Sequence, residues 1–584
     1  MMKVMWMASG SWVGGAMGGV QSASAAAGAA MIFEKDVPIE VGDGTVLRAN
    51  VYRPQQAGRY PVVMALGIYG KDIHFADGYK PQWETLTRIY PGIDRDGSSG
   101  QHLRWELVDP ERWVPAGYVV IAVDSRGSGK SPGYLDPFSP RETQDYYDAI
   151  EWAGVQPWSN GKVGTIGISY YGIKQWQVAA LRPPHLAAIC VWEGGSDLYR
   201  DWSHHGGIFS HLFPTAWYPR QVLPNQHGNA DTHYRERDTG LPNTGAALSQ
   251  AMLAGNRANH PQDLLQHPLD DAWYKARSPN LSRIEVPLLS AANWGGAGLH
   301  LRGNIEGYLR AGSSQKWLQM HIGTHFESFY LPQFVQRQQR FFDHFLKGED
   351  SGWLEEPKIN LFVRRPDGGA FRAEQEWPLA RTDWTRLHLD AAARALLPTT
   401  PQQEARVSYR ALGEGVSFTT PAFEQETEFT GPLKAHLWIS SSTADMDLFA
   451  TLRMFDPAGK EVAFTGASDL TPVARGWLRA SHRKQDAAMT LPYRPYHSHD
   501  EVQKLTPGEA YELDVEIWPA SIVFPAGYRL VLTIQGRDFE THDIPGRILH
   551  NSEQDRPRAE FDGLCSILTG PEHDSYLLLP RIPG

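Results

Sequence analysis

The chain has 584 residues, 41% of them hydrophobic and 21% charged, a balance typical of a globular protein with two or three domains. The net charge of -11 argues against a nucleic-acid-binding surface, and no apolar run after the first thirty residues is long enough to predict a transmembrane helix. Two cysteines cannot form a disulfide framework, and Cys190, in an apolar run, is predicted to be a buried thiol.

The first thirty residues differ from the rest of the chain. Lys3 precedes a weakly apolar, glycine-rich run, and Ala23, Ser24 and Ala25 resemble a small-residue cleavage site. Two interpretations are open: residues 1–30 are a secretory signal peptide, or the start is misassigned and Met31 opens the protein. The first places the protein outside the cytoplasm, secreted or periplasmic, and the second places it inside.

Short apolar runs then alternate with helical patterns, such as the one at residues 143–154. This alternation predicts a mostly parallel sheet with helices on both faces, and functional groups at the carboxyl ends of its strands. The predicted buried strands occupy residues 60–66, 118–123, 162–168, 186–192, 286–292 and 317–322.

Two regions depart from this alternation. Residues 197–281 are rich in His, Trp, Asn and Gln and contain helical patches, including one at 244–255, so we predict a helical cap inserted into the α/β domain. That domain would then consist of residues 31–196 and 282–354. Residues 355–584 show short alternating strands separated by turns, which predict a β-sandwich or jelly roll that packs against the α/β domain and walls its active site.

Ser169 lies between the predicted strand 162–168 and a helical pattern at 173–181. A serine on such a turn fits a nucleophile elbow, in which the hydroxyl is exposed above the sheet and the helix N-terminus faces a developing oxyanion. The common form of the elbow has glycine two residues after the serine, whereas here Tyr171 occupies that place and Gly172 follows. An ordinary strand–turn–helix with a structural serine is the alternative.

A serine nucleophile also needs a base and oxyanion donors. His321 falls inside an apolar strand pattern and is predicted to be a core histidine, whereas His325 follows Gly323 on a loop and is favoured as the general base. Tyr69 follows the strand at 60–66, where such folds supply a second oxyanion donor, and a tyrosine hydroxyl suits that role. Alternatively, Tyr69 is a loop aromatic that packs on the cap.

Two patterns suggest ligand sites but do not meet their requirements. Residues 124–131 resemble a phosphate-binding loop, but Asp124 stands where a glycine is needed and a Pro-Gly pair follows where a helix must begin. We predict a tight turn there, with Arg126 paired to Asp124. The spacing of three histidines in the predicted cap matches no known metal-ligand pattern: His204, His205 and His211.

With these motifs the chain resembles the X-prolyl dipeptidyl-peptidase/cocaine esterase-like (CocE/NonD) family of serine hydrolases. The resemblance implies an α/β fold, in which an α/β-hydrolase domain carries an inserted helical cap and is followed by a C-terminal β jelly-roll domain. Acyl-enzyme chemistry on a serine needs no cofactor. It further implies Ser169 as nucleophile, His325 as base, and the Tyr69 hydroxyl with the Tyr170 N–H as oxyanion hole. The matching segments occur in the family's order at residues 67–71, 113–118, 124–133, 156–172, 196–200 and 476–483.

The chain departs from the family at the catalytic acid. Where the family has a Gly-Trp-x-Asp segment, this chain has Gly296 in place of the aspartate. A triad without its acid can lose ~10⁴ in rate. Glu193 ends the strand before the predicted cap, and we predict that it supplies the missing carboxylate to His325. Asp197 and Glu306 are the alternatives, although Asp197 is expected to cap the first helix of the cap.

These observations predict a serine hydrolase that cleaves an ester or acyl-amide bond of a small molecule or short peptide through an acyl-enzyme, without a nucleic-acid or membrane partner. An X-Pro dipeptidyl-peptidase is the first alternative, disfavoured because no pair of carboxylates to hold a substrate ammonium is evident in the predicted cap. A non-catalytic ligand-binding protein is the second, disfavoured by the combination of Ser169 and His325.

Overall fold

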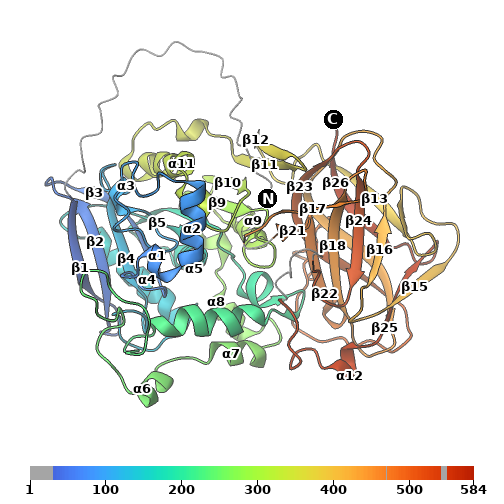
Figure 1. Ribbon diagram of the computed structural model, residues 1–584, viewed down its shortest axis with the longest axis horizontal. Helices are drawn as coiled ribbons and strands as arrows, with labels where there is room; N and C mark the ends of the chain where they lie inside the picture. The colour runs from blue at the N-terminus through green and yellow to red at the C-terminus, as the bar shows by residue number, and fades with distance from the viewer. Residues whose placement is uncertain (1–30, 468–469, 541–548) are drawn as a thin grey trace, which may run out of the picture.

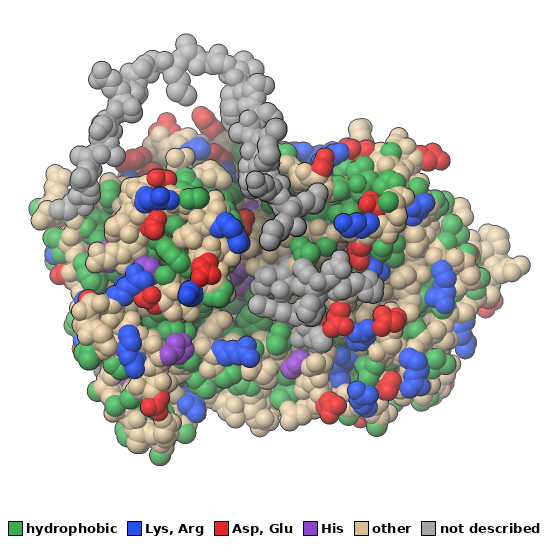
Figure 2. Space-filling view, in the orientation of Figure 1, with side chains coloured by type: hydrophobic (Ala, Val, Ile, Leu, Met, Phe, Trp, Pro, Cys, Tyr) green, Lys and Arg blue, Asp and Glu red, His purple; other side chains and the backbone are tan. Residues whose placement is uncertain are grey.

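The computed structural model describes residues 31–467, 470–540 and 549–584 and consists of an α/β body beside a β-rich body (Figure 1). The signal peptide or alternative start predicted within residues 1–30 lies outside these ranges. Acidic and basic side chains are intermixed over the face shown in Figure 2. Among the described residues, no helix is both long and apolar enough to cross a membrane.

The α/β body is built on a sheet in the strand order β1-β2-β4-β3-β5-β6-β9-β10. The strands from β4 to β10 run parallel, and β1 and β2 are antiparallel to their neighbours, which is the arrangement of α/β-hydrolases. All six predicted strands are present, with ends shifted by a few residues. The strands are β1 (Met31–Glu40), β2 (Val46–Pro54), β3 (Tyr60–Gly67), β4 (Val119–Asp124), β5 (Ser159–Ile168), β6 (Leu186–Trp192), β9 (Leu288–Asn293) and β10 (Lys316–His321).

Both faces of this sheet are buried. In β3, Val62 and Met64 belong to one hydrophobic core, while Val63 and Ala65 belong to the other. The first core is completed by α4 (Pro140–Gly154), α5 (Tyr170–Ala179) and α9 (Leu301–Arg310), and the second by α2 (Lys80–Ile89), α3 (Pro110–Trp113) and α11 (Pro332–Phe342). Because helices cover both faces, the loops at the carboxyl ends of the strands are free to build a site.

The segment between β6 and β9 contains the irregular helical turns η1 (Leu198–Ser203) and η2 (Phe213–Val222), a short hairpin of β7 (His204–His205) and β8 (Ile208–Phe209), and the short helices α6 (Gln250–Gly255), α7 (His260–Gln266) and α8 (Ala272–Arg277). The helix predicted over 244–255 is wrong in its first half. Gly245 has a φ of 77°, and the hydroxyl of Ser249 accepts the N–H of Met252, so α6 begins only after this N-cap.

The β-rich body has a separate core in antiparallel strands. β17 (Thr427–Ser441) pairs with β23 (Tyr511–Phe524) and β26 (Tyr576–Ile582), and β18 (Asp447–Phe455) pairs with β22 (Ala474–Arg479) and β24 (Arg529–Gln535). The two bodies are joined through β11 (Ile359–Arg365), which runs parallel to β10 and touches β23.

A loop of the β-rich body also reaches the carboxyl end of the α/β sheet. The carbonyl of Ala467 accepts the N–H of His325 at 3.0 Å, and the N–H of Ala467 donates to the carbonyl of Gly295 at 3.1 Å. The C-terminal half of the chain therefore contacts the loop that carries the predicted base.

Candidate active site

Ser169 lies at the turn between β5 and α5, with φ 57° and ψ −114°. A non-glycine residue at positive φ is strained and persists where its surroundings fix it. Here the N–H of Ser169 donates to the carbonyls of Trp192 and Glu193 at the end of β6, both at 3.1 Å, and its carbonyl accepts the N–H of Ile173 at 2.8 Å. The backbone therefore has the strained strand–turn–helix form of a nucleophile elbow.

The glycine after the elbow is needed for close packing. A Cβ atom on Gly172 would lie 3.0 Å from the Cα of Gly194, and one on Gly194 would lie 2.6 Å from the carbonyl carbon of Gly172. The first turn of α5 thus rests directly on the chain that leaves β6. This contact accounts for a glycine at position 172, one residue later than in the common elbow.

Glu193, directly after β6, is fully buried and approaches His325. Its Oε2 lies 2.8 Å from His325 Nδ1, while its Oε1 accepts hydrogen bonds from His321 Nε2 at 3.0 Å and from Asn293 Nδ2 at 3.2 Å. Burial opposes ionisation, but His325 and His321 together lower the pKa of Glu193 to about 2. The carboxylate is therefore ionised, and the buried His321 is one of its donors, in keeping with a core position.

The two alternative acids have partners elsewhere. Asp197 caps η1, as predicted, by accepting the N–H groups of Tyr199 and Arg200, and it also pairs with the Arg200 guanidinium at 2.9 Å. Glu306 lies on α9 and pairs with Arg494 of the β-rich body. Glu193 is thus the one of the three carboxylates for which the structure records a bond to His325.

Two polar residues that sequence reasoning missed complete this group. Glu106, in the loop between α2 and α3, places Oε1 3.0 Å from His325 Nε2. His300, immediately before α9, places Nε2 3.1 Å from the hydroxyl oxygen of Ser169. The rings of His300 and His325 stack with centroids 5.4 Å apart and 17° between their planes. His300 could have been found from the sequence, because it lies in the loop after β9 where the family has its catalytic acid. Glu106 lies in no motif, so no sequence signal pointed to it.

The hydrogen bonds of His300 show which of its ring nitrogens carries the proton. The backbone N–H of Gly195 can only donate, and it points at His300 Nδ1 from 3.3 Å, so Nδ1 carries no proton. Burial and the neighbouring His325 lower the pKa of His300 well below its ordinary value, which keeps the ring neutral. The proton of the neutral ring then lies on Nε2, and His300 donates to Ser169 rather than accepting from it.

Tyr69 follows β3, and its hydroxyl is hydrogen-bonded by a residue of the segment between β6 and β9. The indole N–H of Trp217, in η2, donates to the Tyr69 oxygen at 2.9 Å, which leaves the Tyr69 proton available for donation. Burial and the charge of Glu106 raise the pKa of Tyr69 well above its ordinary value, while hydrogen bonding to Trp217 and Ser169 opposes the rise. The hydroxyl is therefore protonated beside Ser169. The N–H of Tyr170, at the first position of α5, has no acceptor within the helix.

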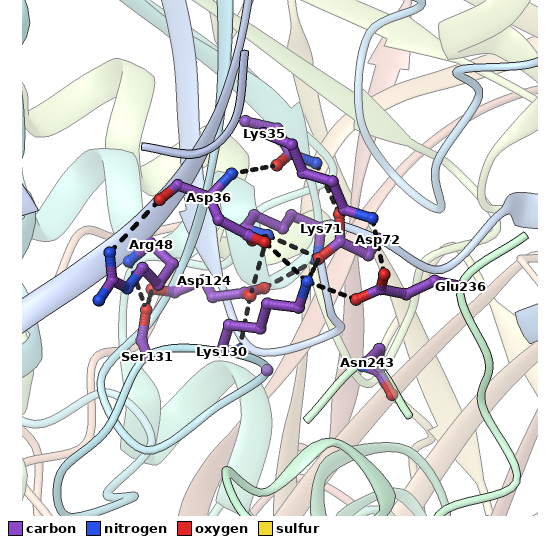
Figure 3. A network of polar contacts seen from close by, with 12 residues as sticks. Lys35, Asp36, Arg48, Lys71, Asp72, Asp124, Lys130, Ser131, Glu236 and Asn243 are labelled. Carbon is purple, nitrogen blue, oxygen red and sulfur yellow. Dashed lines mark hydrogen bonds and ion pairs between the residues drawn. The ribbon is translucent and has the colours of Figure 1, made fainter. Parts of the chain in front are cut away.

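A buried charge network anchors the loop of Tyr69 (Figure 3). Lys71, two residues further on, is 2% exposed, and its ammonium pairs with Asp36 and Asp72, both at 2.6 Å. The carboxylate of Asp124, at the end of β4, accepts the N–H of Lys71 at 2.8 Å. The loop that follows β3 is thus tied to the end of the adjacent strand β4.

The predicted pair between Arg126 and Asp124 is wrong. Arg126 turns toward α4 and binds Asp145 at 2.7 Å, and it also reaches Asp43 at 3.0 Å. Asp124 is instead occupied by the N–H groups of Lys71 and of its own turn. The turn needs glycine at 129, where a Cβ would lie 2.2 Å from an Asp124 oxygen.

Three histidines of the insertion, whose spacing matches no known metal-ligand pattern, bond to protein groups: His204, His205 and His211. His205 Nδ1 lies 2.8 Å from His550 Nε2, and the Tyr274 hydroxyl lies 3.2 Å from His204 Nδ1. Within the described ranges, no group of three or more His, Cys, Asp or Glu side chains is arranged to hold a metal ion. Cys190 and Cys565 are buried free thiols.

Comparison with known proteins gives matches over nearly the whole chain. Residues 43–327 match the family model of X-Pro dipeptidyl-peptidase (S15 family), and residues 351–578 match that of the X-Pro dipeptidyl-peptidase C-terminal non-catalytic domain. The cocaine esterase of Rhodococcus sp. is 25% identical over 94% of this chain and 98% of its own length. A putative Xaa-Pro dipeptidyl-peptidase of Rhodopirellula baltica is 22% identical, over 86% of this chain and 83% of its own.

The fold of this chain is also similar to that of a solved structure. The CocE/NonD family hydrolase of Staphylococcus aureus is 34% identical, covers 95% of this chain and 94% of its own, and superposes with a TM-score of 0.80. This identity and coverage confirm the family that the sequence motifs predicted. The chain therefore belongs to the CocE/NonD family of hydrolases and is a serine hydrolase.

Proposed function

We propose that Ser169 is the nucleophile, His325 the general base and Glu193 the acid that orients it, with the Tyr69 hydroxyl and the Tyr170 N–H as oxyanion hole. The observation that carries this proposal is the 2.8 Å contact between Glu193 Oε2 and His325 Nδ1, made at the strand end that also receives the N–H of Ser169. It supplies the acid that Gly296 does not.

In this mechanism the Ser169 oxygen attacks the acyl carbon, and its proton passes to His325 Nε2. Glu193 holds the other ring nitrogen and stabilises the imidazolium that forms. The negative charge on the former carbonyl oxygen is bound by Tyr69 and the Tyr170 N–H. His325 then gives its proton to the leaving group, and water releases the acyl group by the same steps in reverse.

We propose an uncharged ester or acyl amide as the substrate. Buried carboxylates of the insertion are already paired with cations of the protein: Asp201 with Arg302 at 3.0 Å, and Glu236 with Lys35 at 2.6 Å. A substrate ammonium would have to displace these cations, which favours esterase or acylase activity over an X-Pro dipeptidyl-peptidase.

The organisation of the chain supports this assignment. We propose that residues 197–281 act as a cap on the α/β-hydrolase domain of residues 31–196 and 282–354, since Trp217 of this segment bonds Tyr69. We also propose that the β-rich region 355–584 is a jelly roll that helps wall the site, since the carbonyl of Ala467 binds the N–H of His325.

Two measurements test the proposal. A fluorophosphonate probe should label the purified protein at Ser169 and should fail to label Ser169→Ala; a folded protein that resists the probe would support the non-catalytic alternative. A panel of p-nitrophenyl esters and aminoacyl-proline anilides should then show turnover mainly of the esters. Preferred cleavage of the anilides would instead establish the dipeptidyl-peptidase.

A further inference from the structure

Glu106 is a buried carboxylate in a strained backbone position that the mechanism above does not use. Its φ is 62°, the residue is only 2% exposed, and Oε2 has no hydrogen-bond partner among the described residues. Its carbonyl accepts the N–H of Ile168, the residue before Ser169, at 3.2 Å. Strain of this kind is maintained only where the surrounding structure fixes it, and it clusters at functional sites.

The contact between Glu106 and His325 requires a shared proton. His325 Nδ1 donates to the ionised Glu193, so Nε2 is the atom that must receive the proton of Ser169. Glu106 Oε1 lies 3.0 Å from this Nε2. An unprotonated imidazole nitrogen and a carboxylate oxygen are both acceptors, so at this distance their lone pairs would repel each other. A proton between the two atoms removes the repulsion.

We propose that Glu106 is a positioning residue that shares one proton with His325 Nε2 in the resting enzyme and takes that proton when the base becomes active. This inference rests on the proposed role of His325. The proton moves from Nε2 to Oε1, which converts imidazolium and carboxylate into imidazole and carboxylic acid with no net change of charge. The Nε2 lone pair is then free to accept the Ser169 proton, and Glu106 returns its own proton after turnover.

The surroundings of Glu106 suit a group that alternates between the charged and neutral forms. Burial raises the pKa of Glu106 to about 7, and His325 acts against this rise. Burial lowers the pKa of His325, but Glu193 and Glu106 together raise it to about 10. The other titratable groups around the pair are a neutral histidine, a second ionised carboxylate and four protonated tyrosines: His300, Glu193, Tyr69, Tyr79, Tyr171 and Tyr330.

The proposal predicts the pH dependence of the enzyme. The resting and active forms of the His325–Glu106 pair hold the same single proton, so the acid limb of kcat/KM marks the gain of a second proton by this pair in the free enzyme. Once both the ring and Glu106 are protonated, Nε2 can no longer accept the proton of Ser169. In Glu106→Gln the ring has no internal acceptor and must lose its proton to solvent before it can act, so the limb becomes that of His325 alone and should move about one pH unit or more higher.

Asp109→Asn is the matched control. Asp109 is a buried carboxylate on the same loop, where it caps α3 by accepting the N–H of Glu111. The variant perturbs the loop while leaving the His325 contact in place, so its acid limb should coincide with that of the wild type. An unshifted limb in Glu106→Gln, with a loss of kcat like that of Asp109→Asn, would overturn the proposal and make Glu106 a structural residue.

Imidazole ¹⁵N resonances of the wild-type protein give a test that needs no folded variant at Glu106. The His325 signals, assigned by their absence in His325→Ala, should remain those of a protonated ring above pH 7. Ordinary titration near 6.5 would overturn the proposal. The failure of the underlying function is distinguishable, because His325→Ala would then retain its activity.

Discussion

The two halves of the proposed centre are built in different ways. On the nucleophile side, Ser169 and Tyr170 come from one continuous stretch, and backbone hydrogen bonds to the end of β6 fix the strained turn. On the base side, four residues come from four separate loops and meet through side chains: Glu106, Glu193, His300 and His325. Backbone geometry sets the first half, and the positions of protons set the second.

This difference has consequences for substitution. A change on the nucleophile side should remove the reaction at every pH, because no other group occupies that turn. On the base side, the loss of rate should depend on which proton or hydrogen bond the substitution removes. Such a change should often alter the pH dependence as well.

The largest expected effect is that of Ser169→Ala. Removal of the attacking oxygen should lower kcat by about 10⁶, as for other serine hydrolases, while the backbone contacts of the turn are kept. Ester hydrolysis by the purified variant measures the loss, and an unchanged melting curve by circular dichroism shows that the fold is intact. Substantial residual turnover at any pH would remove Ser169 from the mechanism.

On the base side, Glu193→Gln should cost about 10⁴ in kcat. The amide can hold His325 in the wrong tautomer and cannot stabilise the imidazolium. Asp197→Asn is the matched control, since this residue caps η1 and should change stability by about 1 kcal/mol or less without a comparable loss of rate. Equal losses in the two variants would argue against Glu193 as the acid.

The same contrast explains how far the sequence could be interpreted. The elbow was predictable because strand, turn and helix are contiguous, and because the order of buried strands determines which loops meet at the carboxyl edge of the sheet. The contact of Glu193 with His325 followed the same logic, since β6 and β10 end on the same edge, with β9 between them. Parallel strands of known order constrain the neighbours of their terminal residues.

Glu106 and His300 had no such constraint. Glu106 lies in an irregular loop whose path depends on packing among Trp105, Tyr79 and Phe326, and no local pattern encodes that path. The role of His300 depends on which ring nitrogen faces Gly195, a detail of side-chain rotation. The wrong pairing of Arg126 has the same origin, because proximity along the chain did not reveal that Asp124 is occupied by backbone donors.

A smaller effect is expected at Tyr69, which joins the two halves. Tyr69→Phe should lower kcat by ~10²–10³ with little change in KM, because in the proposed mechanism the lost hydroxyl donates to the oxyanion and not to the ground state. Trp217→Phe keeps that hydroxyl and removes only its indole donor, so its loss should be smaller. A change confined to KM in Tyr69→Phe would make Tyr69 a substrate-packing residue.

The smallest effect, and the sharpest test of the two halves, is expected at His300. As a neutral donor to Ser169 it should contribute one hydrogen bond, so His300→Asn, too short to reach the hydroxyl, should lose about three- to tenfold in kcat/KM. His300→Gln can place an amide N–H near the position of Nε2 and should recover most of this loss. An amide cannot accept the proton of Ser169, so if His300 were the base, both variants would fall by orders of magnitude. Steady-state rates at the wild-type pH optimum, with His325→Ala in parallel, separate the two cases: the donor assignment requires a severe loss in His325→Ala and a mild one in His300→Gln.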